Sequence, residues 1–315
     1  MKKAIHLTIL FAMCALLCGA CVQKPQENED YHIDLADPSQ GIYTAADLIA
    51  FFESGESDTA VLGDSVDLDG AMLKLAVRRG ALTLNGNGNS ITSSADCVIR
   101  LEDGAALTLN HTTIIAGADG IGCLGDARLA GEDLTIQALT NAIYCAGNLN
   151  ILQNSGMSLT GSKGSGIIAQ SLYLEKAAEV AAFGEQSAVH VLKNDLQLTE
   201  NARLSAQTSK YYCALKCAGT LRLENGAELD VKNEGEYHGA ELTGLEISGK
   251  ATIKADGGKH GTGLFLFNLK EDYTVAGHCT PELRLESGRG QLKFVDSVDR
   301  IPDEKTTDTG ETQAE

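Results

Sequence analysis

The sequence has 315 residues, 43% of them hydrophobic and 22% charged, so it can bury a sizeable core and is not of disordered composition. Its formal net charge of −18 disfavours nucleic acid as a partner, and it argues mildly against a polyuronic acid substrate. Tryptophan is absent and aromatic residues make up only 5%, so any core must consist mainly of Leu, Ile, Val and Ala.

Residues 1–20 are predicted to be a secretory signal peptide, because Lys2 and Lys3 precede an apolar run that ends in small residues. Gly19-Ala20-Cys21 resembles the lipobox of bacterial lipoproteins, although Cys18 stands where that motif usually has leucine. The resemblance implies that Cys21 is lipidated and anchors an otherwise soluble domain to the membrane. Ordinary cleavage and export is the alternative. Residues 21–40 are then a lipidated N-terminus and a polar linker.

Residues 41–60 are predicted to form a capping helix. Thr44 and Asp47 have the spacing of a capping box, and ADLIAFF continues as a short apolar helix. The stacked repeats that follow would expose apolar edges at their ends, and such a helix can cover one of them.

The segment GDSVDLDG belongs to the first coil of these repeats and contains three acidic residues. Asp64, Asp67 and Asp69 could bind calcium, but their spacing matches no known calcium loop. We therefore expect solvated side chains at an edge, no metal site and no cofactor.

The motif L-x-L recurs every 20 to 25 residues from Leu82 to Leu245. An apolar pair follows about eight residues later, and then a third segment such as AIYCAG at 142–147. Alternation with a period of two makes each segment a strand, and turns rich in Asn, Gly, Asp and Ser separate them. Three strands in about 23 residues predict an all-β solenoid of nine to ten coils over residues 61–295.

This periodicity resembles that of the pectate-lyase-like superfamily, whose fold is a single-stranded right-handed parallel β-helix. Leucine-rich repeats have a similar period, but their L-x-x-L-x-L-x-x-N signature is missing. Right-handedness follows from the resemblance and from the usual crossover of parallel strands. After an irregular insertion near 269–281, LRLESGRGQLKFV at 283–295 is the expected last coil, and residues 296–315 are an expected disordered acidic tail.

The third strand of each unit is regular enough to separate inward from outward positions. Cys123, Cys145 and Cys217 fall in an inward column, either as buried free thiols or with a disulfide between Cys123 and Cys145. The complete set of inward pairs is Ile99 and Leu101, Ile121 and Cys123, Ile143 and Cys145, Ile167 and Ala169, Val189 and Val191, Leu215 and Cys217, Ala240 and Leu242, and Leu264 and Leu266.

A strip of small residues runs beside the outward column of the third strands, which suggests a shallow groove along the solenoid. Long polysaccharides lie along such faces in the related folds, and this implies a ligand-binding role for outward residues. The alternative is that tight turns or a packed segment require small residues. The outward column is Arg100, Gly122, Tyr144, Ile168, His190, Lys216, Glu241 and Phe265, of which we select Arg100, Tyr144, His190, Lys216 and Phe265 as candidate groove residues.

Catalytic residues do not emerge from the sequence. A lyase needs a base and usually cations, and a glycoside hydrolase needs two carboxyl groups at a defined separation. The outward column offers only Glu241 beside Lys216 and His190. We therefore predict a non-catalytic binding or adhesive module of the bacterial cell envelope, lipid-anchored through Cys21, with a glycan as its first candidate ligand. A polysaccharide lyase or glycoside hydrolase, and a structural envelope protein with a protein partner, are the alternatives.

Overall fold

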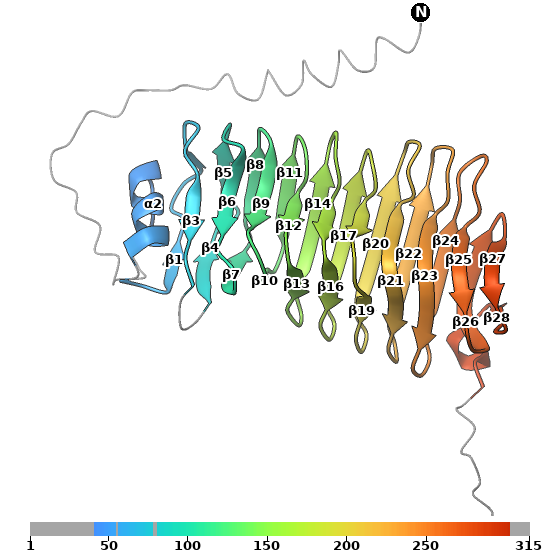
Figure 1. The fold of residues 1–315 in the computed structure, drawn as a ribbon. Coiled ribbons are helices and arrows are strands. Elements are labelled where there is room, and N and C mark those ends of the chain that lie inside the picture. Colours follow the sequence, from blue (N-terminus) through green and yellow to red (C-terminus); the bar gives the residue numbers. More distant parts are fainter. Residues whose placement is uncertain (1–40, 55, 78–80, 303–315) are drawn as a thin grey trace, which may run out of the picture. The chain divides into compact units, whose positions relative to one another are not determined.

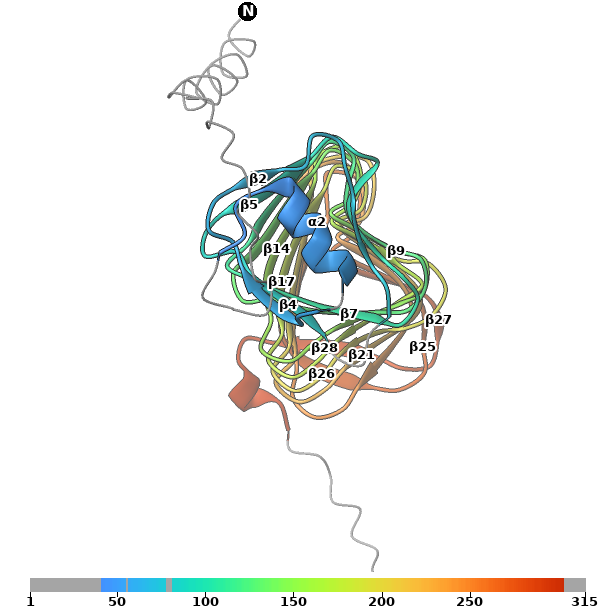
Figure 2. The same cartoon turned by 90° about the vertical axis from the view of Figure 1, so that its left-hand side faces the viewer.

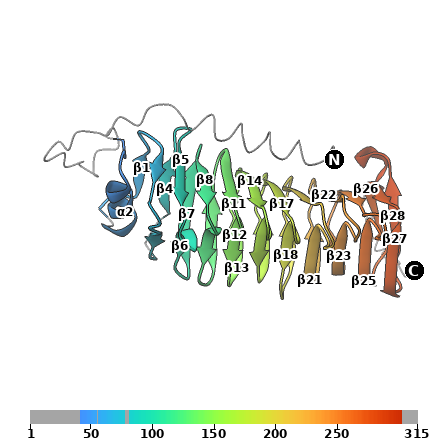
Figure 3. The same ribbon diagram turned by 90° about the horizontal axis from the view of Figure 1, so that it is seen from above.

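The computed structural model describes residues 41–54, 56–77 and 81–302, which form a parallel β-solenoid of about nine turns. Every strand pairing among these residues is parallel, and the coils follow one another in sequence order along one axis (Figures 1 and 3). The predicted all-β solenoid is thus confirmed. The predicted signal peptide (1–20), Cys21 and the predicted linker lie outside the described residues. Within those residues, no helix has the length and apolarity needed to cross a membrane.

The second strands of the coils form an 11-stranded sheet, which we call the second-strand face. Its strands are β2 (Val66–Asp67), β5 (Ser90–Ser93), β8 (Thr113–Ala116), β11 (Leu134–Ala138), β14 (Gly156–Gly161), β17 (Glu179–Gly184), β20 (Arg203–Thr208), β22 (Glu228–Asn233), β24 (Thr252–Asp256), β26 (Tyr273–Thr280) and β28 (Leu292–Val295).

The L-x-L segments form the first-strand face, as predicted from their spacing. Each coil contributes one such strand, and it pairs in register with the L-x-L strand of the next coil, as Leu172 does with Leu196. The separate strands of this face are β1 (Thr59–Val61), β4 (Leu82–Asn85), β7 (Ala105–Asn110), β10 (Ala127–Ala130), β13 (Asn148–Ile151), β16 (Ser171–Leu174) and β19 (Leu196–Leu198).

The third strands form the third-strand face, which joins the first-strand face in one 17-stranded sheet. In the later coils a third strand continues directly into the next first strand, so one long strand serves both faces. These long strands are β21 (Leu215–Leu223), β23 (Ala240–Ile247) and β25 (Leu264–Leu269), and the other third strands are β3 (Leu73–Leu75), β6 (Cys97–Leu101), β9 (Asp119–Cys123), β12 (Ile143–Cys145), β15 (Ile167–Ala169), β18 (Val189–Val191) and β27 (Leu283–Gly288).

The core is a stack of aliphatic side chains inside the coils. All third-strand residues predicted to face inward are no more than 2% exposed, which confirms the assignment of faces. Cys123, Cys145 and Cys217 lie in this interior, and all six cysteines between Cys97 and Cys279 are free thiols, the first of the two interpretations. Burial raises the pKa of Cys97 and of Cys217 to about 11, so both thiols stay protonated at neutral pH.

The one α-helix among the described residues, α2 (Ala45–Ser54), lies across the N-terminal end of the solenoid (Figure 2). Its first turn is closed by Thr44, whose hydroxyl accepts a hydrogen bond from the Asp47 N–H at 3.2 Å, as the capping-box spacing predicted. Leu48, Phe51 and Phe52 point into the first coil and are buried. The helix is shorter than the predicted range 41–60, because β1 already begins at Thr59.

Carboxylate and amide side chains in the turns join each coil to the next. The Asp119 carboxylate accepts from the Asn141 N–H at 2.9 Å, and the Asn141 side-chain oxygen accepts from the Ser165 N–H at 3.1 Å. Asp103 accepts from the Asp126 N–H, and Asp126 from the Asn148 N–H, each at 2.8 Å. These bonds satisfy backbone donors that leave the strand ladder at the corners, which explains the abundance of Asp and Asn there.

Equivalent turn residues in successive coils have a left-handed backbone conformation, and one of these residues is an alanine. Asn154 and Asn201 have φ values of 58°, whereas Ala177 has 55° without a polar side chain that could compensate. We expect Ala177→Gly to stabilise the protein by about 0.5–1 kcal/mol, because glycine carries no Cβ penalty in this region.

Urea unfolding of Ala177→Gly and wild type measures this effect. Ala181→Gly in β17 is the matched control and should lose stability, since glycine weakens a strand interior. A lower midpoint for Ala177→Gly would contradict the expectation.

The chain is ordered beyond the expected last coil. Residues 298–300 form the short 3-10 helix η1 (Val298–Arg300), and Ile301 is buried. Residues 296–302 of the predicted tail, 296–315, belong to the described part of the chain, while residues 303–315 lie outside it.

Candidate functional site

The outward residues of the third strands form one continuous ladder along the solenoid. Register pairs connect Tyr144 with Ile168, Ile168 with His190, and His190 with Lys216. Adjacent rungs of a parallel sheet are about 4.8 Å apart. The ladder, as we call it from here on, comprises Lys74, Arg100, Gly122, Tyr144, Ile168, His190, Lys216, Glu241, Phe265 and Arg284, and so holds all five candidate groove residues.

The strip of small residues beside the ladder is buried and does not form the floor of a groove. A Cβ on Gly120 would lie 2.6 Å from the Ala142 carbonyl oxygen and would overlap the Ile136 side chain. These positions pack into the corner between the second and third strands, so tight turns require small residues there. The buried strip is Val98, Gly120, Ala142, Gly166, Ala188, Ala214, Gly239 and Gly263.

An aromatic cluster covers the C-terminal part of the ladder. The His238 ring stacks on Phe265 at 5.0 Å, and Phe267 meets Phe265 edge-on at 4.9 Å. Tyr237 lies 4.4 Å from His238, and the Arg284 guanidinium lies 5.1 Å above the Phe265 ring. Phe265 is therefore only 8% exposed, so it supports the surface from below and is not the open contact residue that we expected.

The exposed rings of this region belong to other residues. Tyr237 and Phe267 are exposed at the edges of the aromatic cluster, and Tyr211 and Tyr212 are exposed in the turn before β21. Sequence analysis missed all four because it followed only the ladder. The detectable signal is the density of tyrosine and phenylalanine in residues 211–267 of a chain with 5% aromatic residues.

A buried asparagine holds these turns in place. The Asn233 side-chain amide donates to the Tyr212 carbonyl at 2.7 Å and to the His238 carbonyl at 3.0 Å, and its oxygen accepts from the Gly235 N–H at 2.7 Å. Asn233 pairs in register with Thr208, which in turn pairs with Gly184. The residue at this corner is therefore Gly184 in one coil, but Thr208 and Asn233 in the next two coils, where the following turns contain tyrosines.

Lys216 and Glu241 form an ion pair on the ladder, with 3.1 Å between Nζ and Oε1. The other Glu241 oxygen accepts from the Cys213 thiol at 3.5 Å. Burial, followed by the Glu241 charge, raises the pKa of Cys213, so this thiol is no thiolate nucleophile at neutral pH. Glu241 is occupied by both neighbours, which leaves it poorly suited to act as a general base.

Two histidines near this pair are held in the neutral form. Burial and then the Lys216 charge lower the pKa of His190, while Glu241 opposes the shift. Burial likewise lowers the pKa of His238, whose Nδ1 accepts from the Thr262 N–H at 3.0 Å. In this tautomer His238 carries its proton on Nε2 and can donate one hydrogen bond to a ligand.

Acidification is expected to destabilise the fold partly through His190. Because its folded-state pKa lies below the usual 6.5, the unfolded chain takes up the proton first as the pH falls. The neutral His190 ring contributes its full stabilisation above pH 6.5, the usual pKa of histidine. This contribution is lost as the pH falls towards the folded-state pKa.

Thermal unfolding of His190→Gln and wild type between about pH 7.5 and pH 5 measures this contribution. The variant should lose less Tm than wild type, and His260→Gln, at an exposed position, should behave like wild type. A parallel pH dependence of all three proteins would show that His190 contributes nothing.

A polar recess of about 500 Å³ lies on the first-strand face, away from the ladder. If the register between Leu242 and Leu266 continued along the chain, Glu271 would lie opposite Ile247 of the preceding coil. The chain at 268–272 does not pair with β23 in the described structure, and the recess opens between them. Its lining residues are Gln197, Thr220, Arg222, Leu223, Glu224, Thr243, Gly244, Leu245, Glu246, Ile247, Ser248, Asn268, Lys270, Glu271 and Tyr273.

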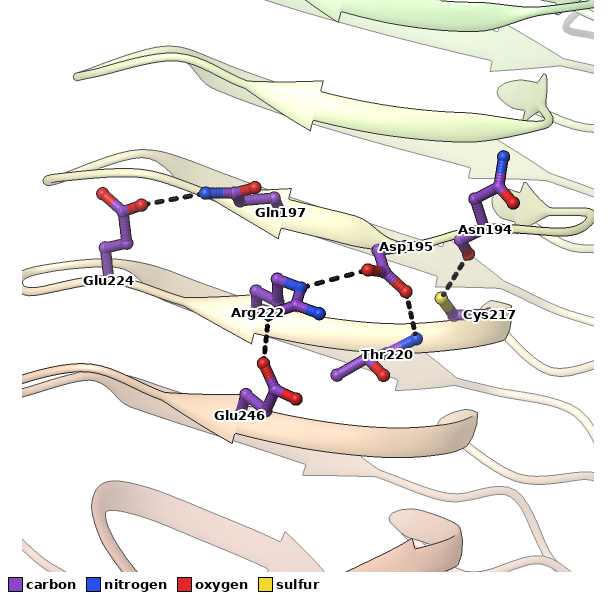
Figure 4. A network of polar contacts seen from close by, with 8 residues as sticks. All are labelled: Asn194, Asp195, Gln197, Cys217, Thr220, Arg222, Glu224 and Glu246. Atoms are coloured by element: carbon purple, nitrogen blue, oxygen red, sulfur yellow. Dashed lines mark hydrogen bonds and ion pairs between the residues drawn. The ribbon is translucent and has the colours of Figure 1, made fainter.

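Three charged residues of this recess, Arg222, Glu224 and Glu246, have polar partners (Figure 4). Arg222 donates to Asp195 at 3.0 Å and forms an ion pair with Glu246. Gln197 donates to Glu224 at 2.9 Å. The recess lies where one L-x-L motif is missing, and it contains no exposed aromatic cluster, so the ladder is the better candidate site.

Within the described residues, no cluster of three or more His, Cys, Asp or Glu side chains could hold a metal ion. The carboxylates of Asp64 and Asp67 accept hydrogen bonds from the N–H groups of Ser65 and Asp69 at 2.7 and 3.0 Å.

Comparisons with known proteins show a distant structural similarity. No family model and no curated protein matches the sequence. The chain is similar to a solved structure titled "L. reuters 100-23 SRRP", with 13% sequence identity and a TM-score of 0.43. The similarity covers 81% of this chain and 99% of that chain. It is too low to support an inference about function.

Proposed function

We propose that this protein is an exported bacterial envelope protein, lipid-anchored through Cys21, whose third-strand face binds a glycan without cleaving it. The observation that carries the proposal is the group of exposed rings around the C-terminal ladder. Tyr237, Phe267, Tyr211 and Tyr212 are exposed in the coils that carry the C-terminal ladder residues, where His190 and Lys216 add hydrogen-bonding groups. Sugar rings offer apolar C–H faces and hydroxyl edges, and amphipathic aromatic side chains suit both.

The proposed surface differs from the second-strand face of the same coils. Ile115 is exposed on that face, but Thr135, Ser158 and Ser205, which also point outward there, are polar. Exposed apolar groups that gather on one face mark an interaction site. The members on or beside the third strands are Leu124, Tyr144, Leu192, Tyr211, Tyr212, Tyr237 and Phe267.

Binding without turnover fits the chemistry of the ladder. Glycoside hydrolysis needs two carboxyl groups facing a substrate. Glu241 is the ladder's one carboxylate, and it is held by Lys216 and Cys213. The envelope location depends on the sequence motif around Cys21 alone.

Affinity electrophoresis in gels that contain neutral or acidic polysaccharides, with and without calcium, tests the proposal. One polymer should retard the wild-type protein, and Tyr237→Ala and Phe267→Ala should each weaken binding about 3- to 10-fold. Ile115→Ala, which removes an exposed side chain from the second-strand face, is the matched control and should bind like wild type. Unchanged affinity in both ring variants would refute the proposed surface.

The same polymers, followed for new reducing ends over a day, separate binding from cleavage. Release from any polymer would favour the lyase or hydrolase alternative over binding alone. Neither retardation nor release across the panel would favour a structural envelope protein with a protein partner.

A further inference from the structure

The two ends of the solenoid differ in how they are covered. At the N-terminal end, α2 buries Leu48, Phe51 and Phe52 against the first coil. At the other end, β27 pairs only with β25, and β28 only with β26, within the described residues. Both strands therefore present an unpaired edge, and such edges favour association with a further strand.

The last coil also leaves apolar side chains uncovered. Leu285 continues the interior column of Leu242 and Leu266, which are fully buried, yet it is 36% exposed because no coil follows it among the described residues. Leu283, Leu292 and Phe294 in the same layer are only partly buried. This end has the composition of a core layer with one side open.

The residues that follow β28 in this sequence bring few apolar side chains to this end. Ile301 is buried beside η1, which contacts β26. Residues 303–315 include no Leu, Ile, Val, Met, Phe or Tyr, so they bring no large apolar side chain to the layer. A second copy of the chain, in contrast, brings the same partly exposed leucines and the same unpaired strand edge.

The charges of β27 are arranged for pairing with a second copy. Arg284 and Glu286 flank Leu285 and point outward, and in one chain they form an ion pair at 2.5 Å. In an antiparallel pair centred on Leu285, Arg284 lies opposite Glu286 of the partner subunit, and the two Leu285 side chains meet. Opposite charges at facing positions stabilise a strand pair, and a twofold axis repeats the contact.

We propose that the C-terminal end of the solenoid is a homodimer interface, in which β27 pairs antiparallel with β27 of a second copy. This geometry makes the interior layers of the two molecules continuous. It also places both third-strand faces on the same side, so that one surface extends over two molecules. The inference is independent of the proposed glycan binding, because it rests only on the end of the solenoid.

Sedimentation velocity of the purified protein over a concentration series tests the proposal. Wild type should show a reversible equilibrium between monomer and dimer. Leu285→Lys should raise the dimer dissociation constant at least tenfold, because it places two lysines opposite each other. Leu124→Lys, at an exposed leucine beside β9, is the matched control and should dimerise like wild type. Circular dichroism checks that each variant is folded.

Charge exchange gives a second test that does not depend on the leucine. Arg284→Glu and Glu286→Arg should each weaken the dimer, and the double variant should restore it because complementarity returns. A wild-type protein that is monomeric at every concentration, a dimer that tolerates Leu285→Lys, or open-ended larger assemblies would each overturn the proposal. Dimerisation only after removal of residues 303–315 would also overturn it, by showing that this segment covers the end.

Discussion

Phe51→Ala is expected to lower the free energy of unfolding by about 4 kcal/mol, the usual cost of deleting a fully buried aromatic ring. Phe51 packs edge-on against Phe52 at 5.8 Å, and both side chains are buried between α2 and the first coil. The truncation leaves a cavity and loosens the helix that shields the open layer of β3. Since each coil is held mainly by its neighbours, we expect unfolding to begin at this end.

Urea unfolding monitored by circular dichroism measures the loss. Glu53→Ala, at an exposed position of the same helix, should change stability by less than about 0.5 kcal/mol. A loss below about 1 kcal/mol for Phe51→Ala would show that the solenoid does not depend on its cap.

Gly263→Ala is expected to cost about 3 kcal/mol, at the upper end of overpacking effects. A Cβ at this position would overlap the Ala255 carbonyl oxygen and would lie 2.8 Å from the Thr280 nitrogen and 2.9 Å from the Cys279 sulfur. Backbone atoms on two neighbouring segments cannot both retreat, so the coil must distort.

Gly122→Ala on the ladder is the matched control, because its Cβ would approach only the Cys97 side chain, at 3.1 Å. We expect this variant to lose less than about 1 kcal/mol. If Gly263→Ala unfolds like wild type, the small strip is not required by packing, and a role on an accessible surface has to be reconsidered.

The sequence was sufficient to predict the coils and the inward residues, because period-two alternation and a repeat near 23 residues are local signals. It could not place the strip around Gly120, since Gly and Ala suit a groove floor and a crowded corner equally well. The direction in which the chain turns at the corner decides between the two, and alternation does not encode that direction.

The candidate site was predictable only in part. Register places His190 and Lys216 on adjacent rungs, as the repeat alignment implied. The burial of Phe265 depends on His238 and Arg284, which come from neighbouring coils and are invisible to a pattern within one strand. Asn233 was missed for the same reason, because its hydrogen bonds join two different turns.

The side-chain bonds between turns have a consequence for how this chain can change in evolution. The Asp103 carboxylate accepts a hydrogen bond from Asp126 in the next coil, and the Asp126 carboxylate accepts one from Asn148 in the coil after that. Each of these bonds joins a coil only to the next one. Removing or duplicating one complete coil would therefore replace every such bond by an equivalent one. A gain or loss of only part of a coil would break the bonds on both sides. The length of this protein can thus change in evolution by the insertion or deletion of whole coils.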